Sequence, residues 1–107
     1  MTDGPFTIAF IGTTDAAQVD AARAFEDDVL ALLPDHGARV LYRGQRRAGQ
    51  DPTLPVEVHL LWFPSGAAFD AYLADERRQE ALARYGDVFT EKVVVEVDEV
   101  GGVSGLP

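Results

Sequence analysis

Hydrophobic and polar residues follow two different periods along this chain, and the changes of period predict its elements. Residues 6–11 form a run of aromatic and β-branched side chains that is typical of a strand. Across residues 15–33 the apolar side chains recur every three or four positions, which indicates an amphipathic helix. Asp15 is suited to cap the start of this helix, and the Pro-Asp-His-Gly sequence of residues 34–37 ends it.

The second half of the chain adds further strands and a second helical region. Three segments have strand composition: residues 38–45, 56–63 and 91–100. Pro64 ends the middle one because proline cannot donate to a strand ladder, and Ser65 can cap the helix that follows. We expect a break in this helix near Ala74, where Asp75 can cap a continuation. Residues 101–107 have the small-residue composition of a flexible tail.

The predicted order of elements is strand, helix, strand, strand, helix, strand. This order matches the ferredoxin-like βαββαβ arrangement of the α+β class, in which a four-stranded antiparallel sheet carries both helices on one face. A length of 107 residues suits one domain, which we place at residues 1–100. The other face of the sheet would then have no helix over it.

Alternate residues of a strand point to opposite faces of the sheet, and we expect the bulkier alternate set beneath the helices. This predicts a packed set: Phe6, Ile8, Phe10, Val58, Leu60 and Trp62. The opposite set includes Glu57 and His59 and would lie on the bare face. Because an open face of mixed apolar and ionisable residues is a liability for a monomer, we expect a second copy of the chain to cover it, sheet to sheet, by two-fold symmetry.

Charge and composition narrow the choice of partners. Eighteen acidic against nine basic residues give a formal charge of -9, which repels phosphate backbones and anionic headgroups, so we expect neither a nucleic acid nor a membrane partner. Cysteine is absent, which excludes disulfides and thiolate chemistry. The N-terminus lacks a basic signal-like region, and no segment approaches the roughly 20 apolar residues of a membrane span. We therefore expect a cytoplasmic protein.

Several motifs together resemble those of the dimeric α/β-barrel superfamily. They are the Leu-Tyr-Arg-Gly-Gln sequence of residues 41–45, the Val-Glu-Val-His-Leu-Leu-Trp-Phe-Pro-Ser sequence of residues 56–65, and the valine-rich last strand. Within that superfamily the chain is most similar to a domain-of-unknown-function family whose second strand ends in R-G-G and whose third strand ends in E-F-P-S. The resemblance covers residues 6–100. Residues 43–44 match the R-G positions and residues 63–65 match F-P-S.

Two positions depart from these motifs. Trp62 stands where the motif has its glutamate, and Gln45 stands where it has the second glycine. Because Trp62 replaces that glutamate, any chemistry that the glutamate performs in those relatives is in doubt for this chain. The resemblance implies a dimeric scaffold whose members include cofactor-free monooxygenases, polyketide cyclases, isomerases and haem-binding enzymes. It therefore implies a small-molecule pocket, either inside the dimer barrel or between the sheet and the helices.

His59 is the main candidate for acid–base chemistry, because an imidazole can take or give a proton near neutral pH. Glu57 lies two residues earlier and could orient that imidazole. Each has a structural alternative, since His59 could bridge the dimer seam and Glu57 could be a solvated carboxylate at the strand end. We expect no metal site, because one strand offers only these two ligands and His36 lies in a separate turn. His59 could also serve as an axial haem ligand, although nothing else in the chain indicates a porphyrin site.

Three other residues are candidates for holding a ligand. Arg43, at a strand end, could bind a carboxylate or phenolate. Tyr72 could contact an aromatic ligand and donate one hydrogen bond, or it could be a core residue. Trp62 could form the wall of a pocket between sheet and helices, or it could belong to the core. Motifs for nucleotide binding and for standard hydrolases do not occur, so we expect no nucleotide cofactor.

These observations predict a homodimer with a small pocket in each subunit. As an enzyme it would act without a cofactor on a small aromatic or polyketide-like acid, as a monooxygenase, cyclase or isomerase. His59 would be its general acid or base, and Arg43 and Tyr72 would position the substrate. The alternative is a non-catalytic ligand-binding or stress-associated dimer. An enclosed cavity beside His59 would favour the enzyme, and a filled seam between the two subunits would favour the alternative.

Overall fold

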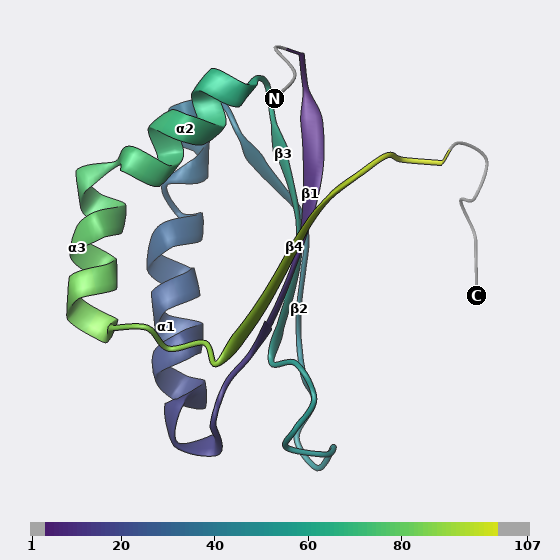
Figure 1. The fold of residues 1–107 in the computed structure, drawn as a ribbon, viewed down its shortest axis with the longest axis vertical. Helices are drawn as coiled ribbons and strands as arrows, with labels where there is room; N and C mark the ends of the chain where they lie inside the picture. Colours follow the sequence, from purple (N-terminus) through teal and green to yellow (C-terminus); the bar gives the residue numbers. More distant parts are fainter. Residues whose placement is uncertain (1–3, 101–107) are drawn as a thin grey trace.

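The chain folds into a sheet layer and a helix layer, in the order of elements that the sequence predicts (Figure 1). The structure is a computed structural model that describes residues 4–100. Its strands are β1 (Phe6–Thr13), β2 (Arg39–Gln45), β3 (Glu57–Phe63) and β4 (Glu91–Val97). Its α-helices are α1 (Val19–Leu30), α2 (Gly66–Ala74) and α3 (Glu76–Tyr85), with 3₁₀ turns η1 (Ala16–Gln18) and η2 (Leu33–His36). The predicted tail at residues 101–107 lies outside the described residues.

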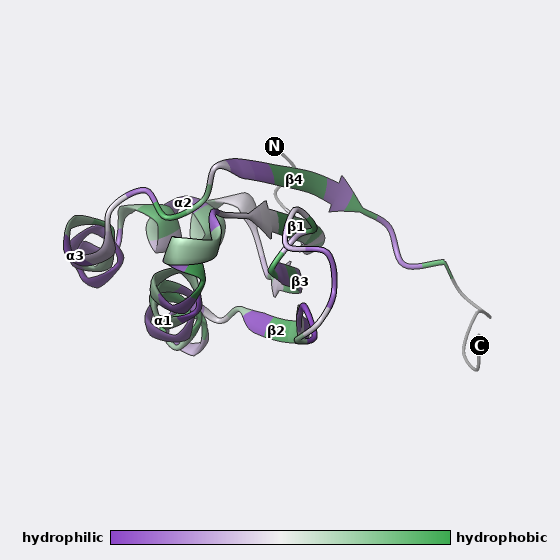
Figure 2. Ribbon diagram, turned by 90° about the horizontal axis from the view of Figure 1, so that it is seen from below, coloured by the Kyte–Doolittle hydropathy of each residue, from purple (hydrophilic) through white to green (hydrophobic). Residues whose placement is uncertain are grey.

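The four strands form one antiparallel sheet in the order β2-β3-β1-β4. All three helices lie on one face of this sheet, and the other face carries none (Figures 1 and 2). This is the ferredoxin-like α+β fold, which confirms the predicted fold class. The last strand ends at Val97 and is shorter than the predicted segment of residues 91–100. Within residues 4–100, each helix is too short or too polar to cross a bilayer.

The predicted helix starts at Ser65 and Asp75 are both confirmed by capping hydrogen bonds. The Ser65 hydroxyl accepts from the Ala68 amide at 3.1 Å, and an Asp75 carboxylate oxygen accepts from the Arg77 amide at 2.9 Å. These two caps divide the helical region into α2 and α3. Asp15 makes no such side-chain bond, and η1 precedes α1 instead.

Two apolar clusters fill the layer between sheet and helices. The first consists of Ile8, Leu30, Leu33, Ala38, Leu61, Phe63 and Tyr72. The second consists of Ala22, Phe25, Val29, Val56, Ala81, Val88 and Phe89. Three acidic or basic side chains are buried in the same layer: Glu26, Glu57 and His59. A buried charge requires partners, so these three residues make this part of the interior a candidate for a functional site.

The predicted facing of β1 is confirmed, and that of β3 is wrong. Phe10 of β1 pairs with His59 of β3 in the antiparallel register, so the two side chains share the helix-covered face. The opposite residues of β3 therefore lie on the outer face: Val58, Leu60 and Trp62. Trp62 stacks there against Arg39, whose guanidinium carbon is 4.5 Å from the ring centroid. The outer set is the more hydrophobic one, because the inner set includes Glu57 and His59, so hydrophobicity alone favours the wrong face.

The outer face of the sheet has no helix over it (Figure 2) and carries exposed apolar side chains. Its exposed side chains include Tyr42, Val58, Val93 and Val95, with exposed fractions from 38% for Val58 to 56% for Tyr42. The strand register places these four residues on the same side of the sheet as Trp62. Among the described residues, most of the exposed large hydrophobic side chains therefore lie in the strands, and none lies in a helix.

Gly12 leaves space for two aromatic rings in the second cluster. A Cβ at this position would lie 2.6 Å from the Phe89 ring and 2.9 Å from the Phe10 ring. We expect Gly12→Ala to destabilise the fold by about 1–3 kcal/mol, as overpacking generally does, in chemical denaturation. Gly4→Ala is the matched control, because nothing lies within 4 Å of its Cβ position. Equal stabilities of the two variants would contradict this packing constraint.

Candidate functional site

A cavity of about 200 Å³ lies between the sheet and the helices, beside His59. Its apolar wall consists of Ile8, Phe10, Val29, Leu30, Leu61, Phe63, Phe69, Leu73 and Val94. Its polar side chains are Glu26, His59, Tyr72, Arg78 and Lys92. The side chain of Val94 is exposed on the edge strand β4, so the cavity opens along that edge. An apolar cavity with a few convergent polar groups is the usual form of a small-molecule site.

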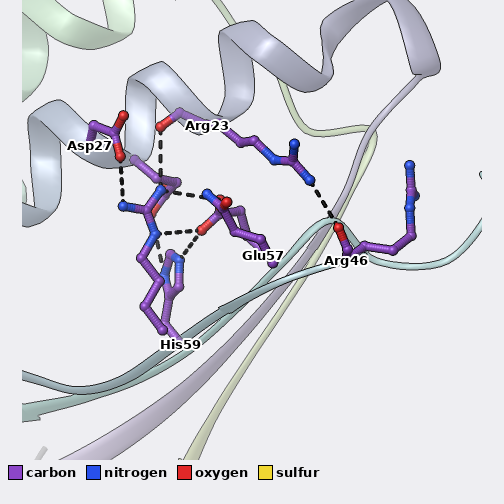
Figure 3. Close-up of polar contacts among 8 residues, drawn as sticks. Arg23, Asp27, Arg46, Glu57 and His59 are labelled. Carbon is purple, nitrogen blue, oxygen red and sulfur yellow. Dashed lines mark hydrogen bonds and ion pairs between the residues drawn. The ribbon is translucent and has the colours of Figure 1, made fainter. Parts of the chain in front are cut away.

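His59 lies between two carboxylates, and Figure 3 shows its contact with one of them, Glu57. Its Nε2 atom is 2.6 Å from Oε1 of Glu57, and its Nδ1 atom is 3.3 Å from Oε2 of Glu26. The exposed fractions of His59, Glu57 and Glu26 are 1%, 0% and 5%. Phe10 stacks against the imidazole with ring centroids 5.1 Å apart. The imidazole is thus fixed on both edges and on one face.

Glu57 is held by donors from the neighbouring strand. Arg43 donates from Nε at 2.9 Å and from Nη2 at 3.1 Å, and the Gln45 amide donates at 2.7 Å. Burial by itself raises the pKa of a carboxyl, but the hydrogen bonds from His59, Arg43 and Gln45 outweigh it. The pKa of Glu57 therefore lies below its ordinary value, and this buried carboxylate stays ionised.

Arg43 links this carboxylate to α1. Its Nη1 atom donates to Asp27 at 2.7 Å, and its Nη2 atom also reaches the Arg23 carbonyl at 3.4 Å (Figure 3). The hydrogen bond to Glu57 is the main cause that raises the pKa of Arg43. The guanidinium therefore bridges β2, β3 and α1 and does not line the cavity. A substrate-binding role for Arg43 stays a prediction.

Glu26 is the buried acid that faces the cavity. Burial raises its pKa from 4.5 to about 7, and the nearby charge of Glu57 adds to the rise, while His59, Arg43 and Arg78 lower it in part. A carboxyl with this pKa exchanges its proton near neutral pH. Such a value suits a general acid or base.

The hydrogen bonds also assign the tautomer of His59. Ionised Glu57 can only accept, so Nε2 of His59 carries a proton and donates it to Glu57. When the imidazole is neutral, its Nδ1 atom is an acceptor that faces Glu26. A protonated Glu26 can then share its proton with that nitrogen. Glu26 and His59 together form a buried pair that can hold or release one proton at the cavity wall.

The other predicted site residues lie in different places. Tyr72 is 4% exposed and lines the cavity, and its hydroxyl donates to the Val29 carbonyl at 3.0 Å. Burial raises the pKa of Tyr72 to about 12, so the hydroxyl keeps its proton. Trp62 lies on the outer face of the sheet, away from the cavity. The structure thus brings His59 and Tyr72 to one cavity, with Glu57 behind His59.

Three polar side chains of the cavity were missed by the sequence reasoning: Glu26, Arg78 and Lys92. The spacing of residues along the helices could have indicated two of them, Glu26 and Arg78. Glu26 follows Ala22 by four residues, and Arg78 precedes Ala81 by three, so each falls on the apolar face of its helix. A charged residue on such a face is a candidate for a buried function. Nothing local marked Lys92, whose place depends on the pairing of β4 with β1.

The described residues offer no obvious metal site. Among residues 4–100, no group of three or more histidine and carboxylate side chains is arranged to hold a metal ion. His36 instead contacts Asp75 at 2.8 Å, where it joins η2 to the start of α3.

Comparison with known proteins supports the fold. A proposed antibiotic biosynthesis monooxygenase from Caulobacter crescentus superposes with a TM-score of 0.69 at 17% identity, covering 92% of each chain. A second one, from Bacteroides thetaiotaomicron, has a TM-score of 0.71 at 10% identity and covers 91% of this chain and 90% of its own. A nipsnap family protein of unknown function from Agrobacterium tumefaciens has a TM-score of 0.70 at 14% identity, covering 92% of this chain and 90% of its own.

These identities are low, and the likeness establishes a shared ferredoxin-like fold. No protein-family model matches the sequence. No curated protein sequence matches it either. The resemblance to the family with the E-F-P-S motif therefore stays a prediction.

The raised pKa of Glu26 predicts how stability depends on pH. Between pH 4.5 and about 7 the folded state keeps a proton that the unfolded state has released, so the free energy of unfolding falls as the pH rises through this window. Chemical denaturation at about pH 5 and about pH 8 should show this loss in the wild type, on the order of 2 kcal/mol relative to Glu26→Gln. If both proteins change in parallel, Glu26 titrates normally.

Proposed function

We propose that this protein binds a small aromatic or polyketide-like acid in the cavity beside His59 and moves a proton to or from it. A cofactor-independent monooxygenase, cyclase or isomerase begins with such a step. The observation that carries the proposal is the juxtaposition of an apolar cavity with the buried Glu26–His59 pair. The fold shared with proposed antibiotic biosynthesis monooxygenases supports the monooxygenase class among the three.

Each group near the pair would have a distinct role. Glu26, with a pKa of about 7, exchanges the proton with the ligand, and His59 is the second site for that proton. Glu57 stays ionised and stabilises the imidazolium that forms when His59 takes the proton. Arg43 acts through Glu57 and is a positioning residue. Tyr72 supplies a flat wall for an aromatic ring.

One observation favours the non-catalytic alternative. Both ring nitrogens of His59 already contact carboxylates of the same chain, as in a purely structural ion network. In that case the cavity would still bind a ligand, but no proton would be transferred. Binding and proton transfer must therefore be measured separately.

We also propose that two chains pair through the outer face of the sheet. This face carries exposed apolar side chains, among them Tyr42, Val93 and Val95. An exposed apolar patch of this kind marks an interaction surface in most soluble proteins. Pairing of two identical sheets by two-fold symmetry would cover both patches at once.

Proton transfer can be tested with 5-nitrobenzisoxazole, a neutral aromatic compound whose ring opens to a coloured phenolate when a base removes one proton. We expect turnover that rises with pH through about 7 as Glu26 ionises. Glu26→Gln should lower kcat/KM by roughly 100-fold, the size of a typical general-base contribution. His59→Gln should move the midpoint of the pH profile upward, because His59 lowers the pKa of Glu26.

Two controls accompany this assay. Asp20→Asn removes an exposed carboxylate from the same helix and should leave the rate unchanged. Val94→Trp places a bulky ring in the cavity wall and should abolish turnover, whereas Glu96→Trp, on the same strand but outside the lining, should not. An unchanged rate in Glu26→Gln would refute the acid–base role. Ligand binding without any turnover would support the non-catalytic alternative.

The predicted dimer has its own measurement. Light scattering at micromolar concentration should give twice the chain mass of 11.6 kDa. Val95→Glu places a charge on the outer face and should yield a monomer, and Ala83→Glu on the exposed side of α3 should not. A monomeric wild type would remove the dimer proposal and leave the cavity proposal intact.

A further inference from the structure

A second, smaller cavity of about 60 Å³ adjoins the one beside His59. It lies against the segment after α3, where Asp87, Val88 and Phe89 line it. The two cavities share four lining residues: Phe10, Glu26, Arg78 and Lys92. We call these four residues the junction. Three of the four are ionisable, so the charged groups of the site gather at the place where the two cavities meet.

Arg78 reaches the junction with an unused donor. Its Nε atom is buried, and no acceptor among residues 4–100 receives a hydrogen bond from it. The guanidinium lies over the Tyr72 ring, with 5.3 Å between its central carbon and the ring centroid. Stacking holds the planar group in place, and its Nε–H is left without an acceptor. A buried N–H without an acceptor is costly, and a ligand that supplies one gains that interaction.

Lys92 approaches the same place from the sheet. It is the only lysine in the sequence, and its strand register places it on the helix-covered side of β4. Within the described residues, no carboxylate lies within 4.0 Å of the charged groups of Lys92 or Arg78. Arg43, Arg77 and Arg84 form ion pairs, and the other arginines without a carboxylate partner do not line this cavity: Arg23, Arg39, Arg46 and Arg47. In a chain with eighteen acidic residues, two cations without carboxylate partners line one cavity.

We infer that Arg78 and Lys92 form an anion subsite at the junction, which binds the carboxylate of a ligand whose apolar body fills the 200 Å³ cavity. Arg78 would donate from Nε and the adjacent Nη atom, in the two-pronged geometry that guanidinium groups form with carboxylates. Lys92 would supply the second charge. A small substituent beyond the carboxylate would enter the 60 Å³ cavity. This inference rests on the proposed function and assigns its acidic ligand to residues other than Arg43.

The subsite also couples ligand binding to the protonation of Glu26. Glu26 is faced by His59 and Glu57 from β3, by Arg43 from β2 and by Arg78 from α3, and it shares the junction with Lys92 from β4. Asp87 lines the smaller cavity nearby. An ionised Glu26 would repel the ligand carboxylate and compete for Arg78. An anion should therefore bind more tightly when Glu26 is protonated, and its affinity should fall as the pH rises through about 7.

The test compares 2-naphthoate with 2-naphthamide, which has nearly the same shape and no charge. Titrations followed by NMR at constant ionic strength should show that the wild type binds 2-naphthoate about tenfold more tightly near pH 6. Arg78→Gln and Lys92→Gln should each remove most of this preference and leave the affinity for 2-naphthamide unchanged. Arg84→Gln removes the same charge from the exposed side of α3 and should keep the preference.

The outcomes separate the subsite from the cavity. The anion-subsite proposal is wrong if both probes bind the wild type equally, or if the preference for 2-naphthoate survives in both Arg78→Gln and Lys92→Gln. In either case the cavity proposal stands. If neither probe binds, the cavity is no ligand site and both proposals fall. Glu26→Gln should abolish the pH dependence of 2-naphthoate binding, and persistence of that dependence would refute the coupling. Lys92 is exposed, so its variant tests the subsite even if Arg78→Gln folds poorly.

Discussion

The fully buried carboxylate of Glu57 is the interaction on which the rest of this interior depends. A buried charge is tolerated only when its oxygens are satisfied, and removing one partner of such a pair typically costs about 3–5 kcal/mol. Arg43, Gln45 and His59 supply the donors here. Arg43 and Gln45 thereby join β2 to β3 through their side chains at this end of the sheet. Through Asp27, Arg43 also fixes α1 over the sheet, and α1 in turn brings Glu26 to the cavity.

The order of elements could be predicted because it follows from local signals. Ser65 and Asp75 cap helices with side-chain oxygens, and Pro64 stops a strand by lacking an amide donor. Each of these effects acts within a few residues of its cause. The spacing of apolar residues likewise identifies the buried face of each helix without reference to the rest of the chain. The βαββαβ order then restricts the arrangement of the sheet to very few topologies.

The residues that form the site could be predicted only in part, because their positions depend on contacts between segments that are distant in the sequence. Val58, Leu60 and Trp62 outweigh Glu57 and His59 in hydrophobicity, so the pattern favours the wrong face of β3. The decisive contact joins Glu57 to Arg43, fourteen residues away on another strand. His59 was found because its chemistry is distinctive. Glu26 could have been found from its spacing on α1, but its raised pKa depends on burial that no local pattern displays.

The break between α2 and α3 divides the helical wall of the cavity into two parts that contribute different kinds of side chain. Phe69, Tyr72 and Leu73 of α2 provide apolar surface, and Arg78 of α3 provides charge. Each helix has its own capping residue, so each is anchored independently of the other. Substitutions at Phe69 or Leu73 can therefore alter which molecular shapes fit without altering which charges are accepted, whereas Tyr72 contributes to both because Arg78 stacks on its ring. A scaffold divided in this way can diversify its ligand range by small, separable mutational steps.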